Sequence, residues 1–471
     1  MNTTARQFTH TPSAPFHISP LDEPVDLLGL HATNPGRYPH LLESVAHGPA
    51  PARFDILFSC PGDSIERRAD GSTWIEGRPL PATSFLEALD TEWCRARTPA
   101  IRGAQDVPPF IGGWFVFLAY ELVAEIEPKL ADLPRSPELP VAKATRFRTA
   151  LLRDRVSGTC SIVGETGTDS LVRQIQDDVR AYAAAPAVNA TRFSTAIDEE
   201  PAEHFLHAVN RVKQYIAAGD VFQVNLSRGW RARLDRAIPP SVLYDRLRNA
   251  NPAPFAGLAT FDEDLAIISS SPERLVEVRD GRIATRPIAG THPRGNNATE
   301  DAALARAMMT HPKERAEHVM LIDLERNDLG RLCTPGTVRV NELMGLESYR
   351  HVHHIVSEVT GALRSDVRPA DVLRAVFPGG TITGCPKIRC MEIIHELEAR
   401  PRSAYTGSIG YINRDGSMDL NILIRSITQN GANLTLRAGA GIVADSDPRR
   451  ELAETRAKAR GLLDALSDHA P

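Results

Sequence analysis

Two pairs of glutamates, each with two residues between them, have a spacing in this sequence that could do chemistry. Glu314 and Glu317 lie in HPKERAEHVMLIDLERND, and Glu451 and Glu454 lie in DSDPRRELAETRAKARGLL. Residues three apart share one helix face, with Cβ atoms about 5–6 Å apart, so each pair can direct two carboxylates at one point. The alternative is solvated surface charge, in which Glu454 would pair with Lys458.

The two pairs together predict a metal site if their helices meet in one cleft. Carboxylates about 4 Å apart repel by roughly 4 kcal/mol per pair at an effective dielectric of 20. A hard divalent cation would relieve this repulsion, and all-oxygen ligation favours Mg²⁺ over zinc. The sequence therefore predicts that Glu314, Glu317, Glu451 and Glu454 bind Mg²⁺.

The segments around these glutamates carry ordinary helix signals. Pro312 can open a helix over 312–324, and Asp447 can cap a helix over 448–466 whose first turn contains Pro448. The strand expected at 434–443 contains Gly439 and Gly441, which leave backbone N–H groups approachable. Close packing between strands would explain the same two glycines.

A glycine-rich turn at 379–384 precedes a helix expected at 386–399. The free N–H groups of a helix start, with Thr381 and Lys387 nearby, would suit a small anion. An ordinary strand-turn-helix connection is equally favoured, and the turn lacks the spacing of a phosphate-binding loop. His354 and Arg425 could also contact an anion or a hydroxyl, although a core histidine and a surface arginine are the simpler interpretations.

Composition excludes several classes of protein. The net charge of −5 gives no reason to expect nucleic acid or an anionic membrane surface. The 6 cysteines show no CxxC spacing, the N-terminus shows no signal-peptide pattern, and no run reaches the roughly 18 apolar residues of a membrane span. These features predict a reduced, cytoplasmic protein.

The 471 residues predict a mixed α/β (α+β) fold of large, mostly antiparallel sheets flanked by helices, because many connections look too short for crossovers. Helices are also expected at 205–218, 300–310 and 386–399, and strands at 54–58, 111–120, 221–226, 265–269, 274–279, 406–412 and 421–427. The predicted organisation is a loosely ordered leader (1–25), an N-terminal region (26–181), a linker (182–202), a catalytic region (203–465) and a tail (466–471).

Motifs over residues 200–465 resemble the chorismate-utilising enzyme family, which includes anthranilate synthase large subunits, aminodeoxychorismate synthase component I, isochorismate synthases and salicylate synthases. The resemblance implies an anthranilate-synthase-component-I-like fold. PHLLES and GGWFVFLAYEL match the family's N-terminal region more weakly. The motifs that carry the resemblance are GDVFQVNLS, SPERL, RPIAGTHPRG, EHVMLIDLERNDLGR, HVHHIVSEVTG, FPGGTITGCPK, AYTGSIGY, RAGAGIV and ELAETRAKA.

The resemblance implies a role for each matching residue. Glu273 in SPERL would be the general acid that protonates the departing C4 hydroxyl of chorismate, with a raised pKa suited to that task. Glu317 and Glu454 would bind Mg²⁺ directly, and Glu314 and Glu451 would hold metal-bound waters. The enolpyruvyl carboxylate would be held by Tyr405, Arg425, Gly439 and Gly441. Further substrate contacts would come from His354, Thr381 and Lys458.

Three positions bear on which member of the family this is. Isochorismate and salicylate synthases activate water with a lysine where this chain has Gln223, so the resemblance implies an aminating enzyme. Asn225-Leu226 resembles the aminodeoxychorismate synthases, whereas anthranilate synthases usually carry Val-Pro there. Ala289 replaces a nucleophilic lysine of some aminodeoxychorismate synthases and is shared with anthranilate synthases. We favour amination at C4 to 4-amino-4-deoxychorismate, with anthranilate formation as the alternative.

The implied partners are chorismate and a separate glutamine amidotransferase subunit that supplies ammonia. Leu42, Glu43 and Ser44 resemble the edge of the family's tryptophan pocket, although an ordinary hairpin would explain them equally. An alternative of another class is a non-catalytic regulator that binds chorismate or tryptophan, in which case the glutamate pairs would have no catalytic role.

Overall fold

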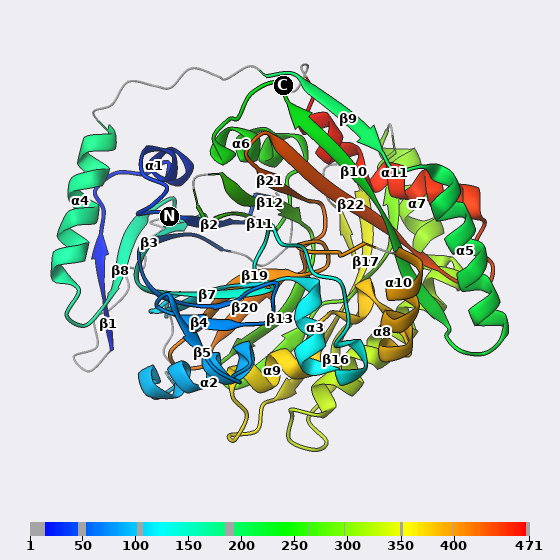
Figure 1. Cartoon of the computed structure of the whole chain (residues 1–471), viewed down its shortest axis with the longest axis horizontal. Helices are drawn as coiled ribbons and strands as arrows, with labels where there is room; N and C mark the ends of the chain where they lie inside the picture. Colours follow the sequence, from blue (N-terminus) through cyan, green and yellow to red (C-terminus); the bar gives the residue numbers. More distant parts are fainter. Residues whose placement is uncertain are drawn as a thin grey trace.

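The computed structural model describes residues 15–45, 53–100, 107–183, 193–262, 264–295, 297–348, 352–398 and 400–467. They form a continuous β-network with helices around it (Figure 1). Every strand pairing among them is antiparallel, which confirms the predicted mostly antiparallel α/β (α+β) fold. No helix within these ranges is long and apolar enough to cross a membrane.

The N-terminal half supplies eight strands, which are β1 Phe16–Pro20, β2 His40–Glu43, β3 Phe54–Arg67, β4 Thr73–Ile75, β5 Arg78–Leu80, β6 Gly113–Leu118, β7 Ala142–Asp154 and β8 Cys160–Glu165. The remaining strands are β9 Thr195–Glu199, β10 Gln223–Leu234, β11 Phe255–Thr260, β12 Leu265–Ser271, β13 Arg274–Arg279, β14 Arg282–Thr285, β15 Ile288–Pro293, β16 Arg339–Ser348, β17 Val352–Ala362, β18 Gly384–Cys385, β19 Ser408–Asn413, β20 Met418–Asn421, β21 Ser426–Asn430 and β22 Asn433–Ile442.

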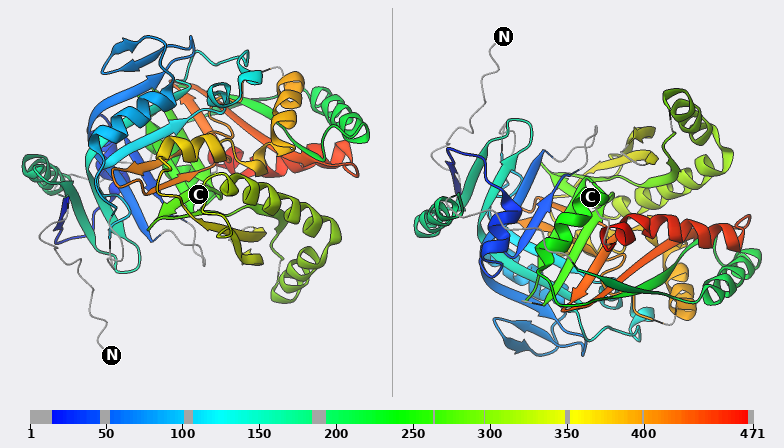
Figure 2. Two further views of the ribbon diagram at one scale, coloured as in Figure 1. Left: turned by 90° about the horizontal axis from the view of Figure 1, so that it is seen from below. Right: turned by 90° about the horizontal axis from the view of Figure 1, so that it is seen from above.

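The α-helices are α1 Leu27–Thr33, α2 Phe85–Ala96, α3 Val123–Ile126, α4 Asp169–Ala183, α5 Ala202–Ala217, α6 Pro240–Ala250, α7 Ala298–Thr310, α8 Pro312–Gly330, α9 Pro369–Val376, α10 Lys387–Glu398 and α11 Pro448–Ala465. Figure 2 shows α11 (red) and the α7–α8 pair (olive) at the same end of the molecule. The predicted starts of α8 and α11 are confirmed: Pro312 and Pro448 lie in the first turns, and the Asp447 side chain accepts a hydrogen bond from the Arg450 N–H.

Strand pairing joins the two halves of the chain. Leu42 of β2 lies opposite Gly257 of β11, and Val116 of β6 lies opposite Gly410 of β19. Within the predicted leader, β1 pairs with β8. The leader, linker and tail lie partly outside the described residues, at 1–14, 184–192 and 468–471. The division into regions stays a prediction.

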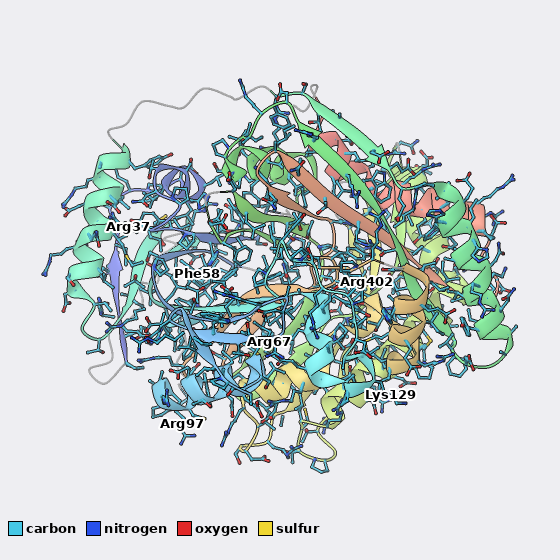
Figure 3. All side chains as sticks on the ribbon, in the orientation of Figure 1. Arg37, Phe58, Arg67, Arg97, Lys129 and Arg402 are labelled. Atoms are coloured by element: carbon cyan, nitrogen blue, oxygen red, sulfur yellow. The ribbon has the colours of Figure 1, made fainter. Side chains whose placement is uncertain are left out.

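The N-terminal half has an aromatic core. The ring of Phe58 lies 4.9 Å from that of Phe110 and 5.3 Å from those of Phe115 and Phe147, and the His40 ring stacks on Phe115 at 3.9 Å. The distances between the phenylalanine rings lie in the range in which aromatic pairs stabilise a core beyond their area burial. Figure 3 shows Phe58 in this half and Arg402 among the strands near α10.

The pairing of β10 with β22 determines where the functional side chains point. Ten consecutive residues pair, from Val224 opposite Ile442 to Arg233 opposite Asn433. Side chains alternate between the two faces of a strand. Even-numbered residues of β22 such as Ala440 and Ile442 enter the core, whereas the odd-numbered ones face the cavities described below.

Two expectations about local structure are wrong. The strand expected at 54–58 continues through Pro61-Gly62, because a register shift between Pro61 and Ser64 absorbs the irregularity. The strand expected at 421–427 is divided into β20 and β21. The helix expected at 386–399 is present as α10, whose buried stripe is formed by Cys390, Met391, Ile393 and Ile394.

The glycine-rich turn is tightly closed on itself. The Thr383 hydroxyl donates to the carbonyl of Gly379 at 2.9 Å, and the Asn225 N–H donates to the carbonyl of Thr383 at 2.9 Å. Lys387 is bound to the buried carboxylate of Asp328. Its ammonium is therefore engaged inside the protein and does not form the anion corner that the sequence suggested.

Gly384 is required for this closure. Its φ is +131°, and a Cβ at this position would lie 2.1 Å from the Gln223 carbonyl oxygen. We expect Gly384→Ala to lower the free energy of unfolding by about 2 kcal/mol or more, because it combines backbone strain with a backbone clash. Urea denaturation measures the change.

Gly431→Ala is the matched control, because Gly431 also has a positive φ of +57° but nothing lies within 4 Å of its added Cβ. We expect it to cost about 1 kcal/mol. Equal losses in the two variants would contradict the importance of the close contact at Gly384.

Candidate active site

A cavity of about 720 Å³ collects most of the residues that the sequence singled out. It lies at the end of the β10–β22 ladder, between α8 and α11. Nine predicted site residues line it, namely Glu314, Glu317, His354, Thr381, Arg425, Gly441, Glu451, Glu454 and Lys458. The two acidic helices therefore meet, as the metal-site prediction required.

The four glutamates reach this cavity from two helices. Glu317 accepts a hydrogen bond from the Gln223 side chain at 2.8 Å, and Glu454 pairs with Lys458 at 2.7 Å. Glu451 is buried, whereas the Glu454 side chain is 47% exposed. Within the described ranges, no group of three or more His, Cys, Asp or Glu side chains is close enough to hold a metal ion.

The lining nevertheless fits Mg²⁺ in its chemistry. The donors that four carboxylates bring to one cavity are hard oxygens, which Mg²⁺ prefers. Lys458 provides a counter-charge for Glu454 in this arrangement. A bound cation would take over that role, and the four glutamates would then have to move closer together. Mg²⁺ binding stays a prediction.

Glu273 lies beside the cavity, directly before β13, and is only 5% exposed. Its pKa is raised to about 7, mainly by burial and in part by the negative charge of Glu325, whereas the Thr381 hydroxyl and the Arg425 guanidinium oppose the rise. A carboxyl in this environment is about half protonated at neutral pH. The protonated form is the state a general acid needs.

Glu325 is a buried acid that sequence reasoning missed. It lies on α8, and burial followed by the charge of Asp328 raises its pKa, whereas Lys387 lowers it. Gly380 packs on this carboxylate so closely that a Cβ there would lie 3.3 Å from Oε1. The turn that carries Thr381 is thus held between two buried carboxyl groups, Glu273 and Glu325. The position of Glu325 in the segment LERND did not indicate a buried acid, because only the tertiary fold buries this side chain.

Arg425 contributes a positive charge to the lining of the cavity, and His354 contributes a neutral polar group. Arg425 has a φ of +52° between β20 and β21, and this backbone turn divides the strand that the sequence predicted as continuous. Its guanidinium is buried in the cavity wall, where burial lowers its pKa. Burial, reinforced by Arg425, lowers the pKa of His354 to about 3, so its imidazole is neutral at physiological pH.

The two glycines of β22 differ in their surroundings. Gly441 lines the cavity, and a Cβ there would lie 2.4 Å from the Gln223 amide nitrogen. A Cβ on Gly439 would lie 2.7 Å from the Tyr405 hydroxyl and 2.8 Å from Asn225 Oδ1. Side chains therefore cover both glycines, Gln223 at Gly441 and Tyr405 with Asn225 at Gly439, which corrects the expectation that they expose bare backbone.

Tyr405 stands in a wall of buried charges next to Gly439. Glu398 forms ion pairs with Arg402 at 2.7 Å and with Arg437 at 3.0 Å, and it accepts a hydrogen bond from the Ser227 N–H at 2.8 Å. The Arg402 guanidinium lies 5.6 Å from the centre of the Tyr405 ring. These contacts fix the ring between the 720 Å³ cavity and a second one on the same face of the sheet.

The segment Leu42-Glu43-Ser44 lies at a separate pocket of about 350 Å³. Leu42 and Glu43 line it, together with the Arg274–Asp419 ion pair at 2.8 Å. The buried Glu43 carboxylate accepts a hydrogen bond from the Tyr244 hydroxyl at 2.9 Å and pairs with Arg153 and Arg248 at 3.2 Å each. Binding of tryptophan at this pocket stays a prediction.

The fold and the cavity define a class of protein: large antiparallel α/β proteins with a cavity lined by glutamates from two helices and by an arginine. The sequence profile of the family described as "chorismate binding enzyme" matches residues 57–464. This chain belongs to that family.

The named relatives include both anthranilate synthases and an aminodeoxychorismate synthase. The chain is 42% identical over 407 residues to an anthranilate synthase component I-like protein of Synechocystis, covering 84% of this chain and 80% of the relative. It is 40% identical over 418 residues to aminodeoxychorismate synthase component 1 of Bacillus subtilis, covering 86% of each. Among solved structures, anthranilate synthase component I of Streptococcus pneumoniae superposes with a TM-score of 0.75 at 30% identity, covering 88% of this chain and 93% of that one.

The two buried carboxyls generate a prediction about pH. Because their folded-state pKa values lie above the ordinary value of 4.5, the folded protein binds more protons than the unfolded chain, and stability falls as the pH rises from about 5 to about 7. We expect Glu325→Gln to reduce that fall by on the order of 1–2 kcal/mol, since it removes one such group and lowers the pKa of Glu273. Urea midpoints at pH 5 and pH 7.5 measure it.

Asp323→Asn is the control, because Asp323 lies on the same helix with a side chain that is 63% exposed. We expect it to leave the pH dependence of stability unchanged. An unaltered pH dependence in Glu325→Gln would show that Glu325 is not held protonated by its surroundings.

Proposed function

We propose that this chain is an aminodeoxychorismate synthase component I. It aminates chorismate to 4-amino-4-deoxychorismate for 4-aminobenzoate and folate synthesis, with ammonia from a separate glutamine amidotransferase subunit. The observation that carries the proposal is the composition of one cavity: four glutamates from α8 and α11, the buried acid Glu273 beside it, and Arg425. The glutamates with a bound cation would hold the ring carboxylate of chorismate, Glu273 would protonate the leaving hydroxyl, and Arg425 would bind the second carboxylate.

Glu317 and Glu454 would hold Mg²⁺ directly, and Glu314 and Glu451 would hold its water ligands. The ion would supply Lewis-acid chemistry by binding the ring carboxylate and making the ring more electrophilic. Gln223 keeps the Glu317 carboxylate oriented through its 2.8 Å hydrogen bond. Such support from a neighbouring side chain is typical of carboxylate metal ligands.

Glu273 is the general acid of the proposed reaction. Ammonia forms the new C–N bond with its lone pair, the C4–O bond breaks with its electrons on oxygen, and the hydroxyl takes the Glu273 proton and leaves as water. A proton lost from the new ammonium group restores the neutral acid. A pKa of about 7 suits both halves of this exchange at neutral pH.

The enolpyruvyl carboxylate is assigned to Arg425. This guanidinium remains charged although it is buried, and a carboxylate that enters the cavity would compensate that charge. Tyr405 closes the neighbouring wall, and neutral His354 offers hydrogen bonds without adding a second positive charge. The arrangement holds the substrate at both of its carboxylates and so positions C4 near Glu273.

Two neutral side chains favour ammonia as the nucleophile. Gln223 is buried at the cavity edge and cannot act as a base toward water, and Ala289, also in the lining, offers no nucleophile for a covalent ring adduct. The lining lysine, Lys458, pairs with Glu454. Ammonia carries its own lone pair and needs no lysine to activate it.

The choice of C4 rests on Asn225 and Leu226. Both lie within the β10–β22 ladder, and the Asn225 N–H donates to the Thr383 carbonyl at 2.9 Å. A Val-Pro sequence, as anthranilate synthases usually carry, would keep this N–H at position 225, would remove the N–H of position 226, and would replace the Asn225 amide with an apolar side chain. The alternative is anthranilate synthase component I, which the names of the Synechocystis and Streptococcus proteins favour.

A product assay separates these two functions. We expect the purified chain, incubated with chorismate, Mg²⁺ and ammonium, to consume chorismate and to give 4-aminobenzoate only after an aminodeoxychorismate lyase is added. A chelator should stop the reaction. Anthranilate fluorescence without the lyase would establish the alternative.

Replacing one glutamate tests whether the chain is a catalyst or a chorismate-binding regulator. We expect Glu454→Ala to lower kcat/KM for ammonium-dependent amination by more than 100-fold, which corresponds to a loss of about 3 kcal/mol of transition-state stabilisation. The exposed Glu203 on α5 is the control position, and Glu203→Ala should leave the rate unchanged. Full activity in Glu454→Ala would refute the catalytic role of Glu454, and absence of amination in both the wild-type chain and the Glu203→Ala control would favour the regulator.

A further inference from the structure

The second cavity, about 840 Å³ in volume, shares its floor with the chorismate site. Gln223, Asn225 and Gly441 line the first cavity, whereas Arg231 and Thr435 line the second. All lie on the odd-numbered face of the β10–β22 ladder, where Asn225 is opposite Gly441 and Arg231 is opposite Thr435. Six residues along a strand span about 20 Å, so the two cavities are close neighbours.

Tyr405 of the second cavity and Asn225 of the first lie against the same glycine, Gly439. Tyr405 lines the second cavity, and its hydroxyl lies against Gly439, two residues from Gly441 of the first. Asn225 Oδ1 lies next to the same glycine and is a buried acceptor with no hydrogen-bond partner in the part of the chain that the structure describes. Asn225 Oδ1 is therefore available to a small hydrogen-bond donor at the side of the first cavity that lies nearest to Tyr405.

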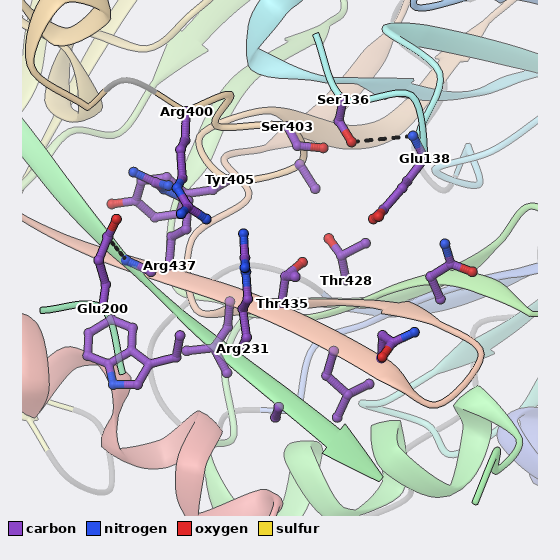
Figure 4. Close-up of a pocket in the computed structure, with 18 of the residues that line it drawn as sticks. Ser136, Glu138, Glu200, Arg231, Arg400, Ser403, Tyr405, Thr428, Thr435 and Arg437 are labelled. Atoms are coloured by element: carbon purple, nitrogen blue, oxygen red, sulfur yellow. Dashed lines mark hydrogen bonds between the residues drawn. The ribbon is translucent and has the colours of Figure 1, made fainter. Parts of the chain in front are cut away.

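The second cavity is an open groove with arginines at the Tyr405 end (Figure 4). Arg231 and Arg400 are exposed, and the side chain of neither forms an ion pair or hydrogen bond with any residue in the described ranges. Arg437 is bound to Glu398, and Glu200 accepts a hydrogen bond from the Gly229 N–H at 2.9 Å. In Figure 4, Glu138 lies across the groove from Arg231 and Arg400.

The remaining lining fits a protein surface. Hydroxyls of Ser403, Thr428 and Thr435 face the groove, and Ile197 of β9, which also lines it, is 44% exposed. Asp198 lies opposite Arg231 in the β9–β10 ladder but forms no ion pair with it in the described chain. Free guanidinium groups among hydroxyls and an apolar side chain match a partner that presents carboxylates within a mixed surface.

We propose that this groove is the docking surface for an acidic segment of the ammonia-supplying subunit, seated so that ammonia enters the chorismate site past Tyr405. The inference rests on the proposed function, which requires an external source of ammonia. Delivery through a protein wall keeps ammonia from being protonated to unreactive ammonium in bulk water.

Charge reversal in the groove tests the proposal. The chain is mixed with a glutamine amidotransferase subunit from the same organism, and amination is measured with glutamine and, separately, with ammonium alone. For the double variant Arg231→Glu/Arg400→Glu we expect a glutamine-dependent rate at least 10-fold lower, loss of co-elution with the amidotransferase, and an ammonium-dependent rate within 2-fold of wild type.

Arg78→Glu is the control, because Arg78 is an exposed arginine on β5 in the N-terminal half, and both of its rates should be unchanged. Thr435→Trp fills the groove without altering charge and should also lower only the glutamine-dependent rate. If the double variant fails to fold, the Thr435→Trp variant tests the docking surface in its place.

Unchanged glutamine-dependent amination and co-elution in the folded variants would overturn the docking surface. A change in the oligomeric state of the chain alone would overturn it in favour of a contact between copies. Absence of ammonium-dependent amination in the wild-type chain would instead refute the proposed function, and co-elution would still report on the surface.

Discussion

The continuous pairing of β10 with β22 is the constraint on which the site depends. Its ten-residue register places Gln223, Asn225 and Gly441 on one face, and the same face carries Arg231, Thr435 and Arg437 farther along. Because side chains alternate strictly along a strand, a slip of one residue would move every one of these groups into the core. The other face, with Ala440 and Ile442, packs into the interior and fixes that register.

Buried charged and acidic side chains are concentrated next to the polar residues of the site, Tyr405 and Thr381. Glu398 binds Arg402, Arg437 and Ser227 together and so supports Tyr405. Glu273 and Glu325 flank the turn that carries Thr381, and burial raises the pKa of each. Breaking a buried pair by removing one partner is costly, because the remaining charge is left uncompensated. The buried ion pairs of Glu398 thus lie in the wall next to the cavity, whereas Glu454 and Lys458 at its rim are partly exposed.

Residues that lie close together along the chain were largely predictable. The starts of α8 and α11 followed from Pro312, Asp447 and Pro448, and the strand expected at 434–443 is present as β22. Predictions failed where a distant neighbour decided the outcome. Lys387, expected at an anion corner, binds Asp328, and Gly439, expected to expose backbone, is covered by Tyr405 and Asn225. A positive φ at Arg425 divides a strand that looked continuous.

By itself, the sequence determined the family and the identity of the acidic residues, because helix periodicity and motif order are local properties of the chain. Only the tertiary structure decided that α8 and α11 line one cavity, that Glu325 lies behind the turn next to Glu273, and that a second cavity adjoins the first at Tyr405. Those relations depend on strand register and on burial. Both arise from contacts between residues hundreds of positions apart, such as the pairing of Asn225 with Gly441, which no local pattern encodes.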